Sequence, residues 1–391
     1  MFYDLFDLHR RQWDSWLGMA LQAGGQSPFL AAHAEIIRRS FGSQRPGSMS
    51  LEDAVRQDAA APVEIVELPR PSAFCRLMRF KRGRGGAEVL FIAPYSGYAT
   101  AVTSPLIAAL GDVIVTDWAD AKDVPLDEGR FGLDEQIELV ARLIAGMDGT
   151  PLLAGLSQSG PVVLAGALLA HARGSALPPG IILLGSPVDT RQAAGPLQHW
   201  LDLLPEGSLE SQLAAVTPER YRGAGRKVYP GFYQLMTYAA TNPGSYLETQ
   251  AGLWSELLSG VSGPYERMHS DLHHLLDLPA ELYGDMIERI LRNAELASGG
   301  MRVAGVTIDP SRLGSVPILS IEARQDELVG CGQTHAAHKL VAGDALPDGG
   351  LAPGSVAVDV DGGHETLFCG PDLNRKVSPH IAAFIAGRGS G

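Results

Sequence analysis

A serine at the apex of a glycine-rich turn is the residue of this sequence with the clearest chemical use. An apolar run, 151–156, ends in Gly155-Leu-Ser157-Gln-Ser-Gly160, and a second apolar run covers 161–170. This pattern is typical of a strand, a tight turn and a helix. Such a turn lifts the Ser157 hydroxyl out of the sheet and puts the backbone N–H of Gln158 where an oxyanion would form. The usual motif is G-x-S-x-G, and Ser159 stands here in place of the last glycine.

The turn alone would also fit a plain Gly/Ser loop before a buried helix, so the other residues of the site decide. A nucleophilic serine needs a base, and the base needs an orienting carboxylate. In the α/β-hydrolase arrangement the chain order is Ser, Asp, His, with the last two on loops after late strands. Asp326 follows a strand-like run that ends at residue 322, and His364 follows another that ends at residue 360. We therefore predict a Ser157–His364–Asp326 triad, with Glu327 as the nearest competitor for the acid.

The second oxyanion donor should come from the loop after an early strand, which we expect over 88–93. That loop is Pro94-Tyr-Ser-Gly97. Alignment with the usual strand-and-loop pattern puts the backbone N–H of Tyr95 in the oxyanion hole beside that of Gln158, with Ser96 as the alternative. A packing role for Tyr95 is an equally good interpretation.

No cofactor or metal is expected from the sequence. There is no glycine-rich phosphate loop, and the adjacent pair His273-His274 lacks ligand spacing. The three cysteines, Cys75, Cys331 and Cys369, form no disulfide framework, and their odd number favours a reducing compartment. Cys331 and Cys369 follow Asp326 and His364 but lie at no strand-to-helix turn. We interpret them as packing or bystander thiols.

Strands that alternate with helices would position these residues. Apolar runs at 88–93, 112–117 and 180–185, with an amphipathic helix over 133–144, predict a mostly parallel sheet covered by helices on both faces. The alternation stops near 195, where a helical, aromatic-rich insertion begins, including a Gly/Arg-rich segment at 221–227 that we expect to be mobile. It resumes with strands at 316–322 and 355–360 and a helix at 379–386. We predict an α/β class, α/β-hydrolase fold with core segments 63–194 and 313–391 around a helical cap, 195–312.

The first 62 residues precede this core. Residues 1 to about 43 are predicted to be helical, followed by a polar linker over 42–62. Apolar side chains of the helical part fall near one face: Phe2, Leu5, Phe6, Trp13, Trp16, Leu17 and Leu21. Such a stripe usually packs on its own protein, and less often it contacts an external hydrophobic surface.

The composition of the chain limits the kinds of binding partner that we expect. The chain has 391 residues, 45% of them apolar, and a formal net charge of −13. An acidic protein is a poor partner for nucleic acid. No apolar run is long enough to span a bilayer and no secretory signal begins the chain, so we expect a cytoplasmic protein. The oligomeric state, including a homodimer, stays open.

The chain resembles the intracellular poly(3-hydroxybutyrate) (PHB) or polyhydroxyalkanoate depolymerases. The resemblance covers nearly the whole length of the chain. It rests on several separated stretches in the same order: Ile92-Ala-Pro-Tyr-Ser-Gly97, Thr116-Asp-Trp-Ala-Asp-Ala121, Val124-Pro-Leu, Glu128-Gly-Arg-Phe131, Gly185-Ser-Pro-Val-Asp-Thr-Arg191, Tyr229-Pro-Gly-Phe232, Asp277-Leu-Pro-Ala-Glu-Leu-Tyr283 and Gly332-Gln-Thr334. The resemblance implies a capped α/β-hydrolase that hydrolyses stored polyester at granules and releases 3-hydroxybutyrate and oligomers. The family usually has a cysteine nucleophile in x-Cys-Gln-Pro, whereas this chain has Ser157-Gln-Ser159 at that place.

Three other functions fit parts of the sequence. A carboxylesterase acting on small or oligomeric esters would use the same triad. A polyester synthase or acyltransferase on this fold typically has an elbow cysteine, so Ser157 favours hydrolysis. A granule-surface protein without catalysis would need no triad.

Overall fold

A central sheet of eight strands organises the fold. The computed structural model of the chain describes residues 2–24, 27–41, 49–83, 87–193, 201, 214–343 and 351–388. The strand order is β1-β2-β4-β3-β5-β6-β12-β13. β2 is antiparallel to β1 and β4, and all other neighbours are parallel. The strands are β1 Glu64–Ser72, β2 Cys75–Lys81, β3 Val89–Ile92, β4 Val113–Trp118, β5 Leu152–Leu156, β6 Ile181–Leu184, β12 Ile318–Ala323 and β13 Val356–Val360.

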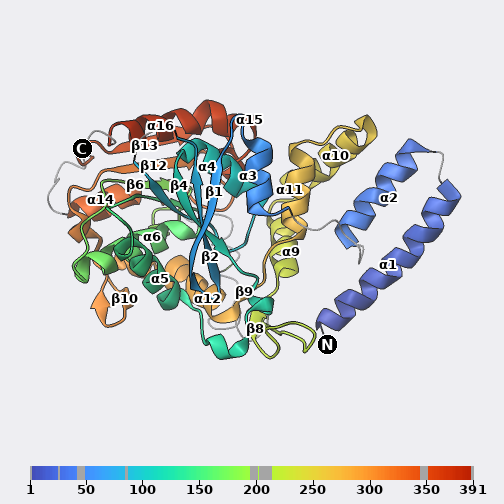
Figure 1. Cartoon of the computed structure of the whole chain (residues 1–391), viewed down its shortest axis with the longest axis horizontal. Helices are drawn as coiled ribbons and strands as arrows, with labels where there is room; N and C mark the ends of the chain where they lie inside the picture. Colours follow the sequence, from blue (N-terminus) through green and yellow to red (C-terminus); the bar gives the residue numbers. More distant parts are fainter. Residues whose placement is uncertain are drawn as a thin grey trace.

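The apolar runs became strands because helices cover both faces of the sheet. Every residue of β3, β5 and β6 is buried, as expected for the middle of a parallel sheet. α4 contacts α3 and α16, and α5 contacts α6, on opposite sides of the sheet (Figure 1). These helices are α3 Leu51–Asp58, α4 Ser104–Leu110, α5 Leu133–Ala145, α6 Ser159–Ala172 and α16 Ser378–Ala386; α14, Ala336–Ala342, lies between β12 and β13 in the chain. This arrangement is the α/β-hydrolase fold, and the predicted fold class is confirmed.

The segment between β6 and β12 is mostly helical, with a small sheet in the order β7-β8-β9. Its elements are β7 Ala215–Val216, β8 Lys227–Tyr229, α9 Gly231–Thr241, α10 Pro243–Ser259, α11 Pro264–His273, β9 Leu278–Pro279, α12 Ala280–Asp285, a π-helical turn Met286–Arg292, α13 Glu295–Ser298 and the hairpin β10 Arg302–Val303 with β11 Val306–Thr307. The cap boundaries 195 and 312 stay predictions, and 194–200 and 202–213, including Trp200, lie outside the described residues.

Two N-terminal helices, α1 Phe2–Gly24 and α2 Pro28–Phe41, form a pair that lies beside the cap (Figure 1). α2 contacts α10 and α11. Arg39 pairs with Glu266 at 2.6 Å, and Ser40 Oγ lies 3.0 Å from Nε2 of His269. The hydroxyl of Tyr3 donates a hydrogen bond to Asp277. The pair is therefore held to the cap by specific polar contacts.

Two local predictions were wrong. The linker contains α3, since Leu51, Ala54 and Val55 are buried at helical spacing. The segment 221–227 is anchored, because Arg226 is 3% exposed and donates to the backbone carbonyls of Val124 and Gly129 at 3.0 and 2.9 Å.

The apolar residues of α1 do not form one buried stripe. Leu17 is 3% exposed, whereas Leu5 is 58% and Trp16 46% exposed. The side chains of Phe2, Phe6 and Leu21 lie outside the described residues. Among the described helices, none is long and apolar enough to cross a membrane.

Candidate active site

The turn after β5 holds Ser157 in a strained backbone conformation. Its φ is +51°, a left-handed value that is rare for a residue with a side chain and costs roughly 1–2 kcal/mol. The Ser157 N–H donates to the carbonyl of Leu184 at 2.8 Å, and the Ser157 carbonyl accepts from Gly160 at 3.1 Å. The strand-to-helix turn predicted from the sequence is therefore present, with the serine at its apex.

Small residues make this turn fit between two neighbouring strands. A Cβ on Gly160 would lie 2.3 Å from the side chain of Ser186, so only glycine allows α6 to pass there. Ser159, the departure from the usual motif, donates from Oγ to the carbonyl of Ile92 at 2.6 Å and also accepts from the N–H of Leu156 at 2.9 Å. Ser159 thus ties the turn to β3, a contact that a glycine would not make.

Asp326 and His364 are brought together by the loops after β12 and β13. Nδ1 of His364 lies 2.7 Å from Oδ2 of Asp326. The other carboxylate oxygen of Asp326 accepts the backbone N–H groups of Leu328 and Val329 at 2.9 and 2.8 Å. Glu327 accepts instead from the backbone N–H of His364 at 3.0 Å. The geometry therefore places Asp326, and not Glu327, at the imidazole.

The environment of His364 is suited to a base. The residue is only 4% exposed. Burial by itself lowers the pKa of His364, but the charge and hydrogen bond of Asp326 outweigh it and raise the pKa above its ordinary value. Gly185, at the end of β6, leaves space for the ring, because a Cβ there would lie 3.0 Å from Cε1 of His364.

Ser157 and His364 line the same cavity, which has a volume of about 260 Å³. Within the described residues, no hydrogen bond joins the Ser157 hydroxyl to the imidazole; such contacts are often long without substrate. The α/β core and the cap both contribute polar and apolar residues to the wall of this cavity. The cap residues on its wall are Tyr229, Gln234, Thr237, Tyr238, Thr241, Met268, Leu272, Tyr283, Met286, Ile287 and Leu291.

The loop after β3 presents Ser96 rather than the side chain of Tyr95 to the cavity. The Tyr95 ring stacks on Trp118 at 5.1 Å, and its hydroxyl donates to the carbonyl of Ala119 at 3.0 Å. Its side chain is thus a core residue. Among the described residues, the backbone N–H groups of Tyr95, Ser96 and Gln158 donate to no acceptor. All three are therefore available as oxyanion donors, and the choice between Tyr95 and Ser96 stays open.

Two cavity residues were not singled out from the sequence. Glu365 follows His364 directly, and its carboxylate accepts a hydrogen bond from the hydroxyl of Tyr238 on α9. Burial raises the pKa of Glu365. The pair links the cap to the loop that carries the histidine. Tyr238 stood among many cap aromatics, and only its place in the fold distinguishes it.

Solved structures of an esterase, a carboxylesterase and a thioesterase resemble this chain at low sequence identity. A thermophilic esterase from Thermogutta terrifontis is 15% identical, with a TM-score of 0.41 over 84% of this chain and 100% of that one. Carboxylesterase CesB from Bacillus subtilis is 13% identical, with a TM-score of 0.42 over 86% and 97%. The RedJ thioesterase from Streptomyces coelicolor is 15% identical, with a TM-score of 0.40 over 88% and 99%. At these values the likenesses carry no functional conclusion.

No curated protein matches the chain. A family model does. The model described as "PHB de-polymerase C-terminus" matches residues 185–388, which is more than half of the chain. The matched region includes Asp326 and His364, whereas Ser157 precedes it. On this match, the chain belongs to the PHB depolymerase family.

Proposed function

We propose that the protein is a serine esterase that cleaves PHB or a related polyhydroxyalkanoate to 3-hydroxyacids and oligomers. The observation that carries this proposal is the meeting of two features at one cavity. Ser157 at its strained turn and His364, hydrogen-bonded to Asp326 at 2.7 Å, both line this cavity. Membership of the PHB depolymerase family supports a polyester as the substrate.

The proposed reaction follows the acyl-enzyme route. Nε2 of His364 accepts the Ser157 hydroxyl proton as Oγ attacks the ester carbonyl, and Asp326 stabilises the imidazolium. The oxyanion is held by the backbone N–H of Gln158 and that of Tyr95 or Ser96, each contributing about 3 kcal/mol. Collapse breaks the ester bond, and His364 protonates the leaving alkoxide. Water, activated by His364, then attacks the acyl-enzyme and releases the 3-hydroxyacid end.

The side chains that line the cavity are suited to a weakly polar substrate. Tyr229 and Tyr283 stack face to face at 3.7 Å between ring centroids, and both line the cavity beside Tyr238. Polyester chains have no charge along their length, so they bind best to a wall of aromatic and aliphatic groups with few polar ones. We further propose that the protein acts in the cytoplasm at the surface of polyester granules, with α1 as the docking element.

The test is degradation of native amorphous granules by wild type, Ser157→Ala and Ser157→Cys, with sizing of the products. We expect Ser157→Ala to lose at least 10³-fold in rate, because no nucleophile remains. The cysteine variant should keep measurable turnover, since a thiolate beside His364 is a competent nucleophile. Iodoacetamide should inactivate this variant and leave wild type active, although wild type contains Cys75, Cys331 and Cys369.

Ser255→Ala on the exposed face of α10 is the matched control and should leave the rate unchanged. Granule hydrolysis that survives Ser157→Ala would refute the triad. Turnover of p-nitrophenyl butyrate without turnover of polyester would instead favour a small-ester carboxylesterase. Efficient polymerisation of 3-hydroxybutyryl-CoA would favour a synthase.

A further inference from the structure

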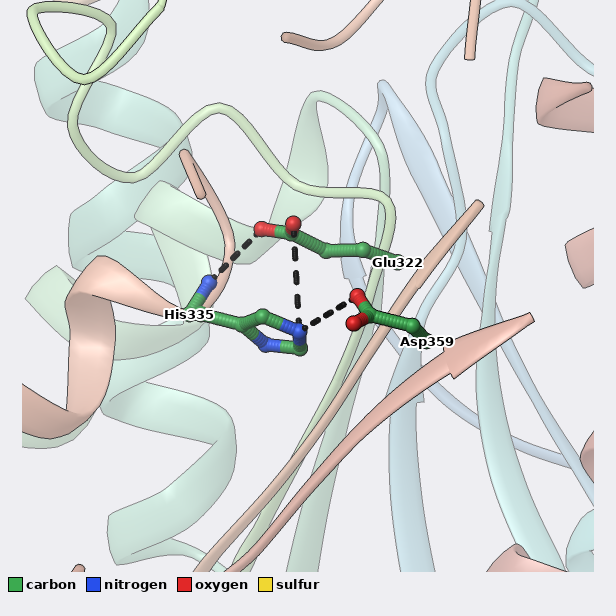
Figure 2. Close-up of side chains that lie close together, drawn as sticks. All are labelled: Glu322, His335 and Asp359. Carbon is green, nitrogen blue, oxygen red and sulfur yellow. Dashed lines mark hydrogen bonds and ion pairs between the residues drawn. The ribbon is translucent and has the colours of Figure 1, made fainter. Parts of the chain in front are cut away.

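Three side chains that commonly bind metals lie together at the β12–β13 end of the sheet, and none of them lines the cavity of Ser157. Figure 2 shows Glu322, His335 and Asp359 pointing toward one another. Nε2 of His335 lies 3.2 Å from Oδ1 of Asp359 and 3.8 Å from Oε2 of Glu322. Ligand atoms around a tetrahedral zinc ion are about 3.4 Å apart. The observed separations of 3.2 and 3.8 Å lie on either side of this distance.

The strand register forces the two carboxylates to face each other. Glu322 on β12 and Asp359 on β13 are direct partners in the parallel ladder, so their side chains leave the same face. Like charges opposite each other across a ladder repel. The Glu322 side chain is only 6% exposed, so water screens its charge poorly. A positive charge between the two carboxylates removes this cost.

Glu322 is held rigidly in place. Its Oε1 accepts the backbone N–H groups of Thr334 and His335 at 2.7 and 2.8 Å, and its Oε2 accepts that of Gly332 at 2.6 Å. A carboxylate oxygen has two lone pairs, so Oε2 keeps one that can bind a cation. The ligand is therefore preorganised.

The His335 ring is also oriented from behind. Its Nδ1 lies 2.7 Å from Oγ of Ser320, and the same Oγ lies 2.7 Å from Nε2 of His338. In the tautomer in which Ser320 accepts from Nδ1–H of His335 and donates to His338, Nε2 of His335 carries no proton and can bind a metal. Metal-binding histidines are typically held in this way by a hydrogen bond to the nitrogen that does not bind the metal.

We infer that Glu322, His335 and Asp359 bind one divalent cation of the zinc class. An imidazole ligand favours zinc and its transition-metal neighbours over calcium and magnesium. The Asp359 side chain is 48% exposed, which leaves room for water to complete the coordination. Arg324 is the competing cation, but it pairs with Asp361 at 3.1 Å and stays 4.0 Å from the other oxygen of Asp359.

The site has a structural role at the base of the active site. Glu322 is four residues before Asp326, and Asp359 is five residues before His364. A cation that joins β12, β13 and the turn before α14 therefore fixes the two strand ends from which the loops of the proposed acid and base begin. It should raise the thermal stability of the whole protein, because a ligand that binds only the folded state stabilises it.

The experiment titrates Zn²⁺ into the chelator-treated full chain by calorimetry, and follows the melting temperature with Zn²⁺, Mg²⁺ or Ca²⁺. Wild type should bind one Zn²⁺ and melt at a higher temperature with Zn²⁺ than with Mg²⁺ or Ca²⁺. His335→Gln and Asp359→Asn should each weaken Zn²⁺ affinity at least tenfold. The matched control is His380→Gln, an exposed histidine on α16. This variant should bind Zn²⁺ as wild type does.

Wild type that binds no Zn²⁺ would overturn the inference. Equal Zn²⁺ affinity in wild type, His335→Gln and Asp359→Asn would also overturn it, because the ion would then lie elsewhere. The wild-type titration needs no variant to fold. Circular dichroism verifies the fold of each variant before its affinity is compared.

Discussion

Ser157 shows how one residue can be fixed by its surroundings against its own preference. Its left-handed φ of +51° is unfavourable for serine, yet the hydrogen bond to Leu184 and the contacts of Ser159 with β3 hold the turn. Strain of this kind persists only where neighbouring structure determines the backbone, and it is concentrated at functional sites. The result is a hydroxyl that faces the cavity instead of the core.

The pKa of His364 gives the first prediction at this scale. The proposed base works only when neutral, and Asp326 raises its pKa above the ordinary value of about 6.5. Activity should therefore fall as the pH drops through this raised pKa. In Asp326→Asn the midpoint should move to lower pH, and the rate at high pH should fall by roughly 10³–10⁴-fold, since the imidazolium loses its partner.

The measurement is the pH profile of kcat/KM on a soluble ester for both proteins. Asp361→Asn, which also removes one carboxylate from this end of the sheet, should leave the midpoint in place. An Asp326→Asn profile that overlays that of wild type would contradict the proposed role of Asp326.

Chain order was enough to propose the triad residues, whereas contacts between side chains that are distant in the sequence could not be predicted. Ser157, Asp326 and His364 each follow a recognisable strand, so a turn motif and two loop positions were enough to name them. Glu365 and Tyr238 meet only because α9 lies over the histidine loop. Glu322, His335 and Asp359 are separated by 13 and 24 residues in the chain and follow no ligand spacing, so the sequence predicted no metal.

At the scale of elements, burial decided which predictions succeeded. β3, β5 and β6 are buried on both faces, and a short continuous apolar run is typical of such strands. The helix α3 was hidden because it has only three buried residues in a polar segment. The two faces of α1 were not separable from the sequence, since both carry large apolar side chains and only burial in the folded protein distinguishes them.

The link between cap and core gives a prediction at this scale. The Tyr238 hydroxyl of α9 bonds the carboxylate of Glu365 beside the proposed base. In Tyr238→Phe the ring still lines the cavity, but the cap loses this hydrogen bond, which is worth about 1.5–3 kcal/mol when one partner is charged. We expect KM for polyester or oligomers to rise about tenfold, with little change in kcat on p-nitrophenyl butyrate.

Kinetics on both substrates check this effect, and Tyr246→Phe on α10 serves as the matched control. A Tyr238→Phe variant that loses turnover on both substrates equally would contradict a role confined to the cap. It would instead give the Tyr238–Glu365 pair a role in positioning His364.

At the scale of the whole molecule, the two N-terminal helices add an apolar surface that the core and the cap leave uncovered. On α1, Tyr3 and Leu17 point inward and are buried. Leu5, Leu8, Trp16 and Met19 share the opposite face at helical spacing and are 46–63% exposed. We name these four side chains the outer stripe. A stripe of this kind on an acidic protein fits an uncharged hydrophobic surface better than a charged one.

The last prediction follows from the outer stripe and from the proposed polyester substrate. Burying one large apolar side chain contributes roughly 1.5–3 kcal/mol, so the triple variant Leu5→Ser, Trp16→Ser and Met19→Ser should weaken binding to amorphous PHB granules at least tenfold. Turnover of p-nitrophenyl butyrate should be unchanged, because no contact between α1 and the proposed triad is found in the described part of the chain. Leu126→Ser alters an equally exposed leucine on the surface of the α/β-hydrolase part of the chain. This control variant should bind granules as wild type does. Co-sedimentation with granules measures the binding. Equal sedimentation of all three proteins would exclude α1 as the docking element, and the polyester would then have to reach Ser157 through the cap alone.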